Sequence, residues 1–161
     1  MQEVNTSPTG AIYRLFKTEV LKIRSNISIP NSICFSPDGL YAYFSDTKKQ
    51  QLYCLKLNDQ GTPIESPELA IDFTGTTLYP DGAVFDDKGS LYIAMWGAGC
   101  VIRYSHKFAE LNRFELPVDF PTCPGIDPWH PGRLWVTSAS EGCRTANRSN
   151  GRLLYLDFEK L

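Results

Sequence analysis

Two polar residues, Asn31 and Asp81, occupy the same place in two copies of one sequence motif. Residues 29–39 read IPNSICFSPDG and residues 79–89 read YPDGAVFDDKG, so that a proline, a phenylalanine and a glycine recur at an offset of 50. The oxygen atoms of an amide and a carboxylate suit a hard cation such as Ca²⁺. A carboxylate can also take a proton from water. The pair is therefore a candidate functional site, provided that the fold brings the two copies together.

The letters Pro-Asp-Gly occur twice, and the two occurrences call for different interpretations. Residues 37–39 fall between two strand-like runs, which predicts a hairpin turn: proline presets φ, aspartate bonds the backbone and glycine takes the unusual dihedral. Residues 80–82 instead precede the strand-like run that contains AVFD. For Asp81 a role as a turn residue stays open as the alternative to a role in a site.

Short aromatic and β-branched runs follow each motif and predict strands. One set is YAYFSDT (41–47), SLYIAMW (90–96) and RLWVTSAS (133–140), and the next is QLYCLKLND (51–59), CVIRYSHK (100–107) and GRLLYLDF (151–158). GAIYRLF (10–16) is an earlier remnant of that last strand, and FPTCPGIDPWHPG (120–132) is a looser third copy of the motif. HKFAELNRF (106–114) can be drawn as a helical turn, but its position between two strands favours a hairpin.

The spacing of these strands predicts the architecture. Ile12, Leu52, Val101 and Leu153 are 40, 49 and 52 residues apart, and periods of about 40–50 residues with several strands each are typical of β-propeller blades. We therefore predict an all-β fold with about three and a half four-stranded blades in one partial domain, residues 1–161. Its units are a remnant at 10–28, then 29–78, 79–119 and 120–161. Because the first strand of each blade lines the central channel, Asn31 and Asp81 are expected to be neighbours around one axis.

Composition narrows the classes of function. The chain has 161 residues, 42% of them hydrophobic, and a net charge of −2 without a run of like charges, so a nucleic acid partner is not expected. No window has the roughly 18 apolar residues that cross a bilayer, and the first ten residues do not resemble a signal peptide. The cysteines, at 34, 54, 100, 123 and 143, form no C-x-x-C pair, which argues against a zinc site built on thiolates. We expect a cytoplasmic protein without membrane association.

Four ordered segments resemble one known family. GAIYR, IPNSICFSPDGLYAYFSDT, YPDGAVFDDKGSLYIAMWGAGCVIRY and RLWVTSA are similar to the motifs of the senescence marker protein, gluconolactonase and regucalcin family. The resemblance implies a six-bladed propeller that hydrolyses sugar lactones and related esters with one divalent metal ion on its axis. It also implies that this chain corresponds to the second half or so of that fold, as an incomplete ring.

The resemblance implies roles for two residues. Asn31 stands where the family has a metal-ligating asparagine, and Asp81 where it has an aspartate that binds the metal and is the candidate general base. Ca²⁺ is the expected ion, with Zn²⁺, Mn²⁺ and Mg²⁺ as alternatives. The chain departs from the family at Ser32, where a glycine is usual, and at residues 121–127, where PTCPGID replaces a Phe-Gly-Gly stretch.

Two functions from different classes follow. The first is a metal-dependent lactonase with a small sugar lactone as substrate and Asp81 as base. The alternative is a truncated, catalytically incomplete propeller fragment or scaffold, because the glutamate that completes the family's metal site belongs to a first blade with no counterpart here. A propeller used only for protein contacts has no support beyond fold analogy. Open blade edges also predict self-association of the chain.

Overall fold

The computed structural model describes residues 7–130, 132–140 and 149–158, which form thirteen β-strands and a single 3₁₀ turn. The first strands are β1 (Gly10–Phe16), β2 (Glu19–Ile27), β3 (Pro30–Phe35), β4 (Tyr41–Asp46), β5 (Gln51–Lys56) and β6 (Glu68–Asp72), with the 3₁₀ turn at Thr47–Lys49. They are followed by β7 (Pro80–Phe85), β8 (Leu91–Met95), β9 (Cys100–Tyr104), β10 (Glu110–Glu115), β11 (Pro121–Ile126), β12 (Arg133–Ser138) and β13 (Leu153–Asp157). No helix in these ranges has the length and apolar character needed to cross a bilayer.

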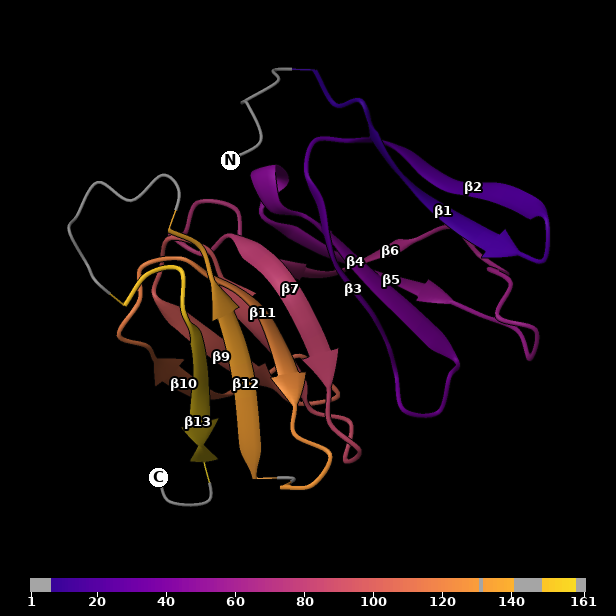
Figure 1. Cartoon of the computed structure of the whole chain (residues 1–161). Helices are drawn as coiled ribbons and strands as arrows, with labels where there is room; N and C mark the ends of the chain where they lie inside the picture. Colours follow the sequence, from indigo (N-terminus) through magenta and orange to yellow (C-terminus); the bar gives the residue numbers. More distant parts are fainter. Residues whose placement is uncertain (1–6, 131, 141–148, 159–161) are drawn as a thin grey trace.

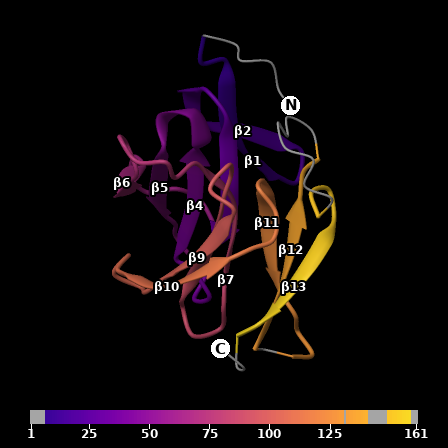
Figure 2. The same ribbon diagram turned by 90° about the vertical axis from the view of Figure 1, so that its left-hand side faces the viewer.

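The strands form four antiparallel sheets, each built from neighbours in the sequence. The orders are β1-β2, β3-β4-β5-β6, β7-β8-β9-β10 and β11-β12-β13. Figure 1 shows β3, β7 and β11 side by side with the other strands of their sheets fanning outwards, and β7 contacts both β3 and β11. Figure 2 shows the same sheets after a quarter turn, with β5 and β6 on one side of the molecule and β11–β13 on the other. The prediction of an all-β, propeller-type repeat with an open ring is confirmed.

The β8 strand shows why the sheets stack as blades. Its sequence LYIAM has no polar residue, and all five side chains are buried. Alternation along the strand sends Ile93 and Met95 into the core against the β3–β6 sheet, and Tyr92 and Ala94 into the core against the β11–β13 sheet. Burying a large apolar side chain stabilises the fold by about 1.5–3 kcal/mol. The middle sheet is thus held by two apolar interfaces, and its first strand is fixed relative to both neighbours.

The two Pro-Asp-Gly segments have different structures. Asp38 accepts a hydrogen bond from the Leu40 amide at 2.9 Å, and Gly39 has a φ of 72°, so residues 37–39 form the predicted turn. Asp81 lies inside β7, which excludes the turn-residue alternative for it. Residues 106–114 form a hairpin between β9 and β10, as their position between strands predicted.

The β1–β2 hairpin exposes apolar side chains, which supports the prediction that the chain self-associates. Leu15 and Val20 face each other across the hairpin and are 70% and 66% exposed. We expect the chain to sediment as a species larger than a monomer, and Leu15→Lys with Val20→Glu to shift it toward the monomer, because the apolar contact area is lost. A compact wild-type monomer across the concentrations tested by sedimentation velocity would contradict this prediction.

Candidate functional site

Asn31 and Asp81 line the same cavity, which has a volume of about 520 Å³. It lies where β3 and β7 begin, with Thr122 and Cys123 of β11 on one wall and Ala11, Ile12 and Tyr13 of β1 on another. The structure therefore brings together the two residues that the repeat singled out. It also places residues 122 and 123, within the stretch that departs from the family pattern, beside them.

Equivalent backbone hydrogen bonds position Asn31 and Asp81 at the starts of their strands. The Thr47 amide donates to the Ile29 carbonyl at 3.0 Å, and the Trp96 amide donates to the Tyr79 carbonyl at 2.9 Å. Each bond fixes the residue before a proline, and that proline begins the strand. Asn31 and Asp81 follow those prolines, so they leave equivalent points of neighbouring sheets toward one space.

Asp46, at the end of β4, holds the chain that leads to Asn31. Its carboxylate is 1% exposed and accepts hydrogen bonds from the amides of Ser28 at 2.9 Å and Ile29 at 3.2 Å. Lys49 lies 3.6 Å from the same carboxylate on the exposed side. Because a buried carboxylate is stable only when its lone pairs are satisfied, these amides fix the approach to β3.

A short hydrogen-bond chain orients the Asn31 side chain. Its amide nitrogen donates to the Thr47 hydroxyl at 3.0 Å, and that hydroxyl donates to the Pro80 carbonyl at 2.6 Å. The chain crosses from the β3–β6 sheet to β7 next to Asp81. With the nitrogen of the Asn31 amide engaged, its oxygen is the end that remains to coordinate or accept from a ligand.

Ser32, the departure from the family's glycine, ties the two strands together. Its backbone has a φ of 57°, in the left-handed region that glycine favours. Its hydroxyl donates to the Asp81 carbonyl and accepts from the Ser45 hydroxyl at 2.9 Å. Ser32 is 2% exposed, so these bonds are made away from water. The serine keeps the glycine-like conformation and adds a link to the backbone of Asp81.

Asp81 is a carboxylate in a largely neutral cavity. Burial raises the pKa of Asp81 from its ordinary value of 3.8 to about 6. The described residues that line the cavity include no lysine or arginine to offset its charge. A cation beside this carboxylate would recover part of the lost solvation.

The donors present fit a hard divalent cation but supply only part of a coordination shell. Asp81 gives a carboxylate and Asn31 an amide oxygen, both suited to Ca²⁺. In the described part of the chain, no group of three His, Cys, Asp or Glu side chains is placed to hold a metal ion. The residues therefore fit a metal ion weakly, as a partial oxygen-ligand set.

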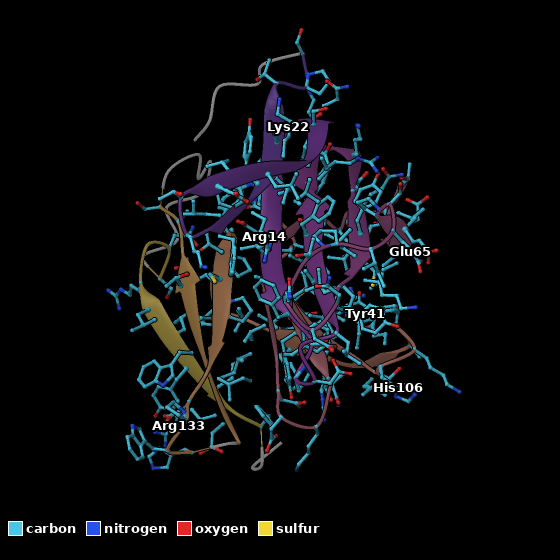
Figure 3. All side chains as sticks on the ribbon, turned by 90° about the vertical axis from the view of Figure 1, so that its right-hand side faces the viewer. Arg14, Lys22, Tyr41, Glu65, His106 and Arg133 are labelled. Atoms are coloured by element: carbon cyan, nitrogen blue, oxygen red, sulfur yellow. The ribbon has the colours of Figure 1, made fainter. Side chains whose placement is uncertain are left out.

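The two histidines lie away from this cavity. His106 is in the turn of the β9–β10 hairpin, and Figure 3 shows it far from Arg133, the residue that begins β12. His130 precedes Arg133 and has its ring nitrogen Nδ1 3.3 Å from the Asp127 carboxylate. Neither histidine is among the residues that line the cavity. They lie in different sheet units and do not form a ligand pair.

Asp46→Asn is expected to lower the free energy of unfolding by about 1–2 kcal/mol. The new side-chain NH₂ group would face a backbone N–H whose hydrogen bond the carboxylate now accepts. Urea unfolding followed by tryptophan fluorescence measures the change. Asp72→Asn is the control, because Asp72 also accepts a backbone bond, from Thr74 at 3.0 Å, but is fully exposed. Equal effects of the two substitutions would contradict the anchoring role of Asp46.

Comparisons with known proteins agree with this geometry. The profile of the SMP-30/Gluconolactonase/LRE-like region matches residues 1–140. A protein of Rhizobium meliloti (strain 1021) named as a sugar lactone lactonase is 40% identical over 141 residues, which are 87% of this chain and 48% of the relative. An L-arabinolactonase of Azospirillum brasilense is 36% identical over 147 residues, 88% of this chain and 48% of the relative.

A solved structure shows the same fold at a similar identity. Regucalcin from Agrobacterium tumefaciens strain C58, described as a calcium-binding protein, superimposes with a TM-score of 0.90 at 39% identity, covering 96% of this chain and 54% of regucalcin. The chain thus spans about half the length of the relatives that it matches. With the profile match over most of its length, the chain belongs to the SMP-30/gluconolactonase/LRE-like family.

Proposed function

We propose that this chain carries part of the active site of a sugar lactone hydrolase, with Asp81 as the general base and a divalent cation held beside Asp81 and Asn31. The observation that carries the proposal is the shared cavity: a half-buried carboxylate and an oriented amide, from two neighbouring sheets, open into one space. The names of the Rhizobium and Azospirillum relatives support a sugar lactone as the substrate class.

The size of the cavity suits such a substrate. Its volume of about 520 Å³ falls within the range of roughly 300–1,000 Å³ that is usual for small-molecule sites. Its lining is mixed, with apolar groups such as Ile33 and Ala83 beside the polar strand starts. A sugar lactone presents both an apolar ring face and several hydroxyls, so this lining matches its surface.

Asp81 has the properties that a base needs in this reaction. With its pKa near 6, Asp81 is largely ionised at neutral pH yet basic enough to remove a proton from water in the transition state. The attacking water loses that proton to the carboxylate as its oxygen bonds to the lactone carbonyl carbon. When the ring C–O bond breaks, the proton returns from Asp81 to the departing ring oxygen, which leaves the open-chain acid.

The other residues act by position. The Ser32 hydroxyl holds the backbone of Asp81, and Thr47 holds both the Asn31 amide and the Pro80 carbonyl. These bonds hold in place the two strand starts that carry the oxygen donors, which reduces the entropy lost when substrate binds. A bound divalent cation supplies positive charge that polarises the lactone carbonyl and makes water a stronger acid.

A second candidate is a catalytically incomplete scaffold. The observation that favours it is that Asp81 is the one carboxylate among the described residues lining the cavity. Titration calorimetry of this chain with Ca²⁺ and with Mn²⁺ separates the candidates. Dissociation constants in the micromolar range support the enzyme, whereas millimolar binding supports the scaffold, because two donors bind weakly.

The proposed activity is tested by following acid release from D-glucono-1,5-lactone and L-arabino-1,4-lactone in a pH-stat, corrected for spontaneous hydrolysis. Catalysis should require added divalent cation, disappear with a chelator and disappear in Asp81→Ala. Turnover that survives in Asp81→Ala would end the assignment of the base. Turnover that persists with the chelator would end the assignment of the cation.

A further inference from the structure

A third strand-start residue, Thr122, occupies the position in β11 that Asn31 and Asp81 occupy in β3 and β7. Each of these strands begins at a proline. In each case the carbonyl of the residue before that proline accepts an equivalent backbone hydrogen bond. The bonds run from Thr47 to Ile29 at 3.0 Å, from Trp96 to Tyr79 at 2.9 Å and from Ala139 to Phe120 at 2.9 Å. The residues after the three prolines are therefore equivalent, and all three line the cavity.

Gly82 brings Thr122 close to Asp81. A Cβ atom added to Gly82 would lie 2.7 Å from the Thr122 carbonyl oxygen and 2.8 Å from the Cys123 sulfur, closer than real Cβ contacts. Only a residue without a side chain allows β11 to approach β7 this closely. Thr122 is thus held directly across from the strand that carries the proposed base.

The Thr122 hydroxyl keeps hydrogen-bonding capacity for a ligand. Its oxygen lies 2.6 Å from the Thr137 hydroxyl oxygen, which also accepts from the Cys123 amide at 3.1 Å. A hydroxyl has one proton and two lone pairs. If Thr122 donates to Thr137, both of its lone pairs remain. If it accepts from Thr137, one lone pair and its proton remain. In either case Thr122 can accept a hydrogen bond from a ligand hydroxyl in the cavity.

We propose that Thr122 is a specificity-determining residue that accepts a hydrogen bond from a hydroxyl of the sugar lactone, and that it thereby favours hydroxylated over unsubstituted lactones. This inference rests on the proposed function. Asp81 and Asn31 act at the reacting carbonyl, whereas Thr122, on the third wall, contacts the ring substituents. A site with a polar group for a substrate hydroxyl discriminates against a lactone that lacks it, since that group is then left unpaired.

The kinetic test compares D-glucono-1,5-lactone with δ-valerolactone, which has the same ring without hydroxyls. Thr122→Val keeps the side-chain shape and removes the hydroxyl, and Thr122→Ser restores it. For Thr122→Val we expect KM for the sugar lactone to rise roughly 3- to 10-fold, as for the loss of one neutral hydrogen bond. Its kcat and both constants for δ-valerolactone should stay unchanged, and Thr122→Ser should behave as wild type. Equal changes for the two lactones, or none, would overturn the inference.

A binding measurement judges the inference separately from the proposed hydrolysis. Cys123 is exposed and lines the cavity next to Thr122, so its alkylation by iodoacetamide, followed by peptide mass spectrometry, reports occupancy. The cyclic polyol 1,5-anhydro-D-glucitol has no carbonyl and is not consumed. It should slow the labelling of Cys123 in the wild type and in Thr122→Ser but not in Thr122→Val. If the polyol protects Cys123 in this way but no lactone is hydrolysed, the proposed function is wrong and the role of Thr122 in binding a ligand hydroxyl stands. Labelling that the polyol slows equally in Thr122→Val, or does not slow in the wild type, would overturn the inference.

Discussion

Asp81→Asn is expected to make the chain more stable at neutral pH while lowering lactone hydrolysis by about 10²–10⁴-fold, the usual contribution of a general base. Asparagine has nearly the same shape as aspartate, so the variant removes a half-buried charge without opening a cavity. The charge is costly because burial raises the pKa of Asp81 to about 6 with no basic side chain in the described lining to offset it. The residue most important for the proposed chemistry is therefore one that destabilises the fold.

The sign of the pH dependence follows from the direction of this shift. Between its ordinary pKa of 3.8 and its folded value of about 6, the folded chain binds more protons at Asp81 than the unfolded chain does. The contribution of Asp81 to stability is therefore fully present below pH 3.8 and is lost as pH rises to about 6. Asp81→Asn should match the wild type at pH 3.5 and exceed it by about 1–2 kcal/mol at pH 7.5, a value reduced for partial solvent screening.

Urea unfolding of both proteins across this pH range measures the difference directly, because other titrating groups cancel between them. Asp38→Asn is the matched control, since Asp38 belongs to the second Pro-Asp-Gly and is fully exposed. Added Ca²⁺ or Mn²⁺ should stabilise the wild type at pH 7.5 more than Asp81→Asn. A variant that is less stable than the wild type at pH 7.5 would show that Asp81 has a compensating partner.

The repeat allowed much of the architecture to be predicted. Strand runs that recur every 40–52 residues show their own local alternation, so the sheets and the hairpin at residues 106–114 could be recognised from the sequence alone. The motif offset of 50 residues placed Asn31 and Asp81 at equivalent points, and the structure puts both on one cavity. Their roles as ligand and base remain predictions, because the number of oxygen donors around a cation depends on residues from several sheets at once.

The residues that sequence reasoning missed are those whose roles depend on long-range contacts. Asp46 ends a strand in a common Ser-Asp-Thr sequence, and nothing local indicates that its carboxylate holds amides 17 and 18 residues earlier. Thr122 was hidden because the third copy of the motif lacks the phenylalanine and glycine that mark the first two. The proline at residue 121 was the one signal left, since it stands directly before Thr122 as Pro30 stands before Asn31.

Gly82→Ala is expected to lower the free energy of unfolding by about 2–3 kcal/mol, a large effect for one methyl group. The new Cβ would meet the Thr122 carbonyl oxygen at 2.7 Å and the Cys123 Cα at 2.8 Å. Both are backbone atoms, so no side-chain rotation relieves the contact, and β11 must move away from β7. The apolar interface between the β7–β10 sheet and the β11–β13 sheet, which contains Tyr92 and Leu134, would then pack less tightly.

Gly125→Ala, in β11 itself, is the matched control. A Cβ atom at Gly125 meets nothing within 4 Å, so this variant adds a methyl group to the same strand without a steric contact. By restricting the unfolded chain it should stabilise the fold by about 0.4–1 kcal/mol, and the two alanine variants should differ in sign. Hydrogen exchange locates the effect: Gly82→Ala should expose amides of β11 and β12 and leave β4 and β5 protected. If the two variants unfold at the same urea concentration, β7 and β11 are not packed against each other in solution, and Thr122 is too far from Asp81 to contact the same ligand.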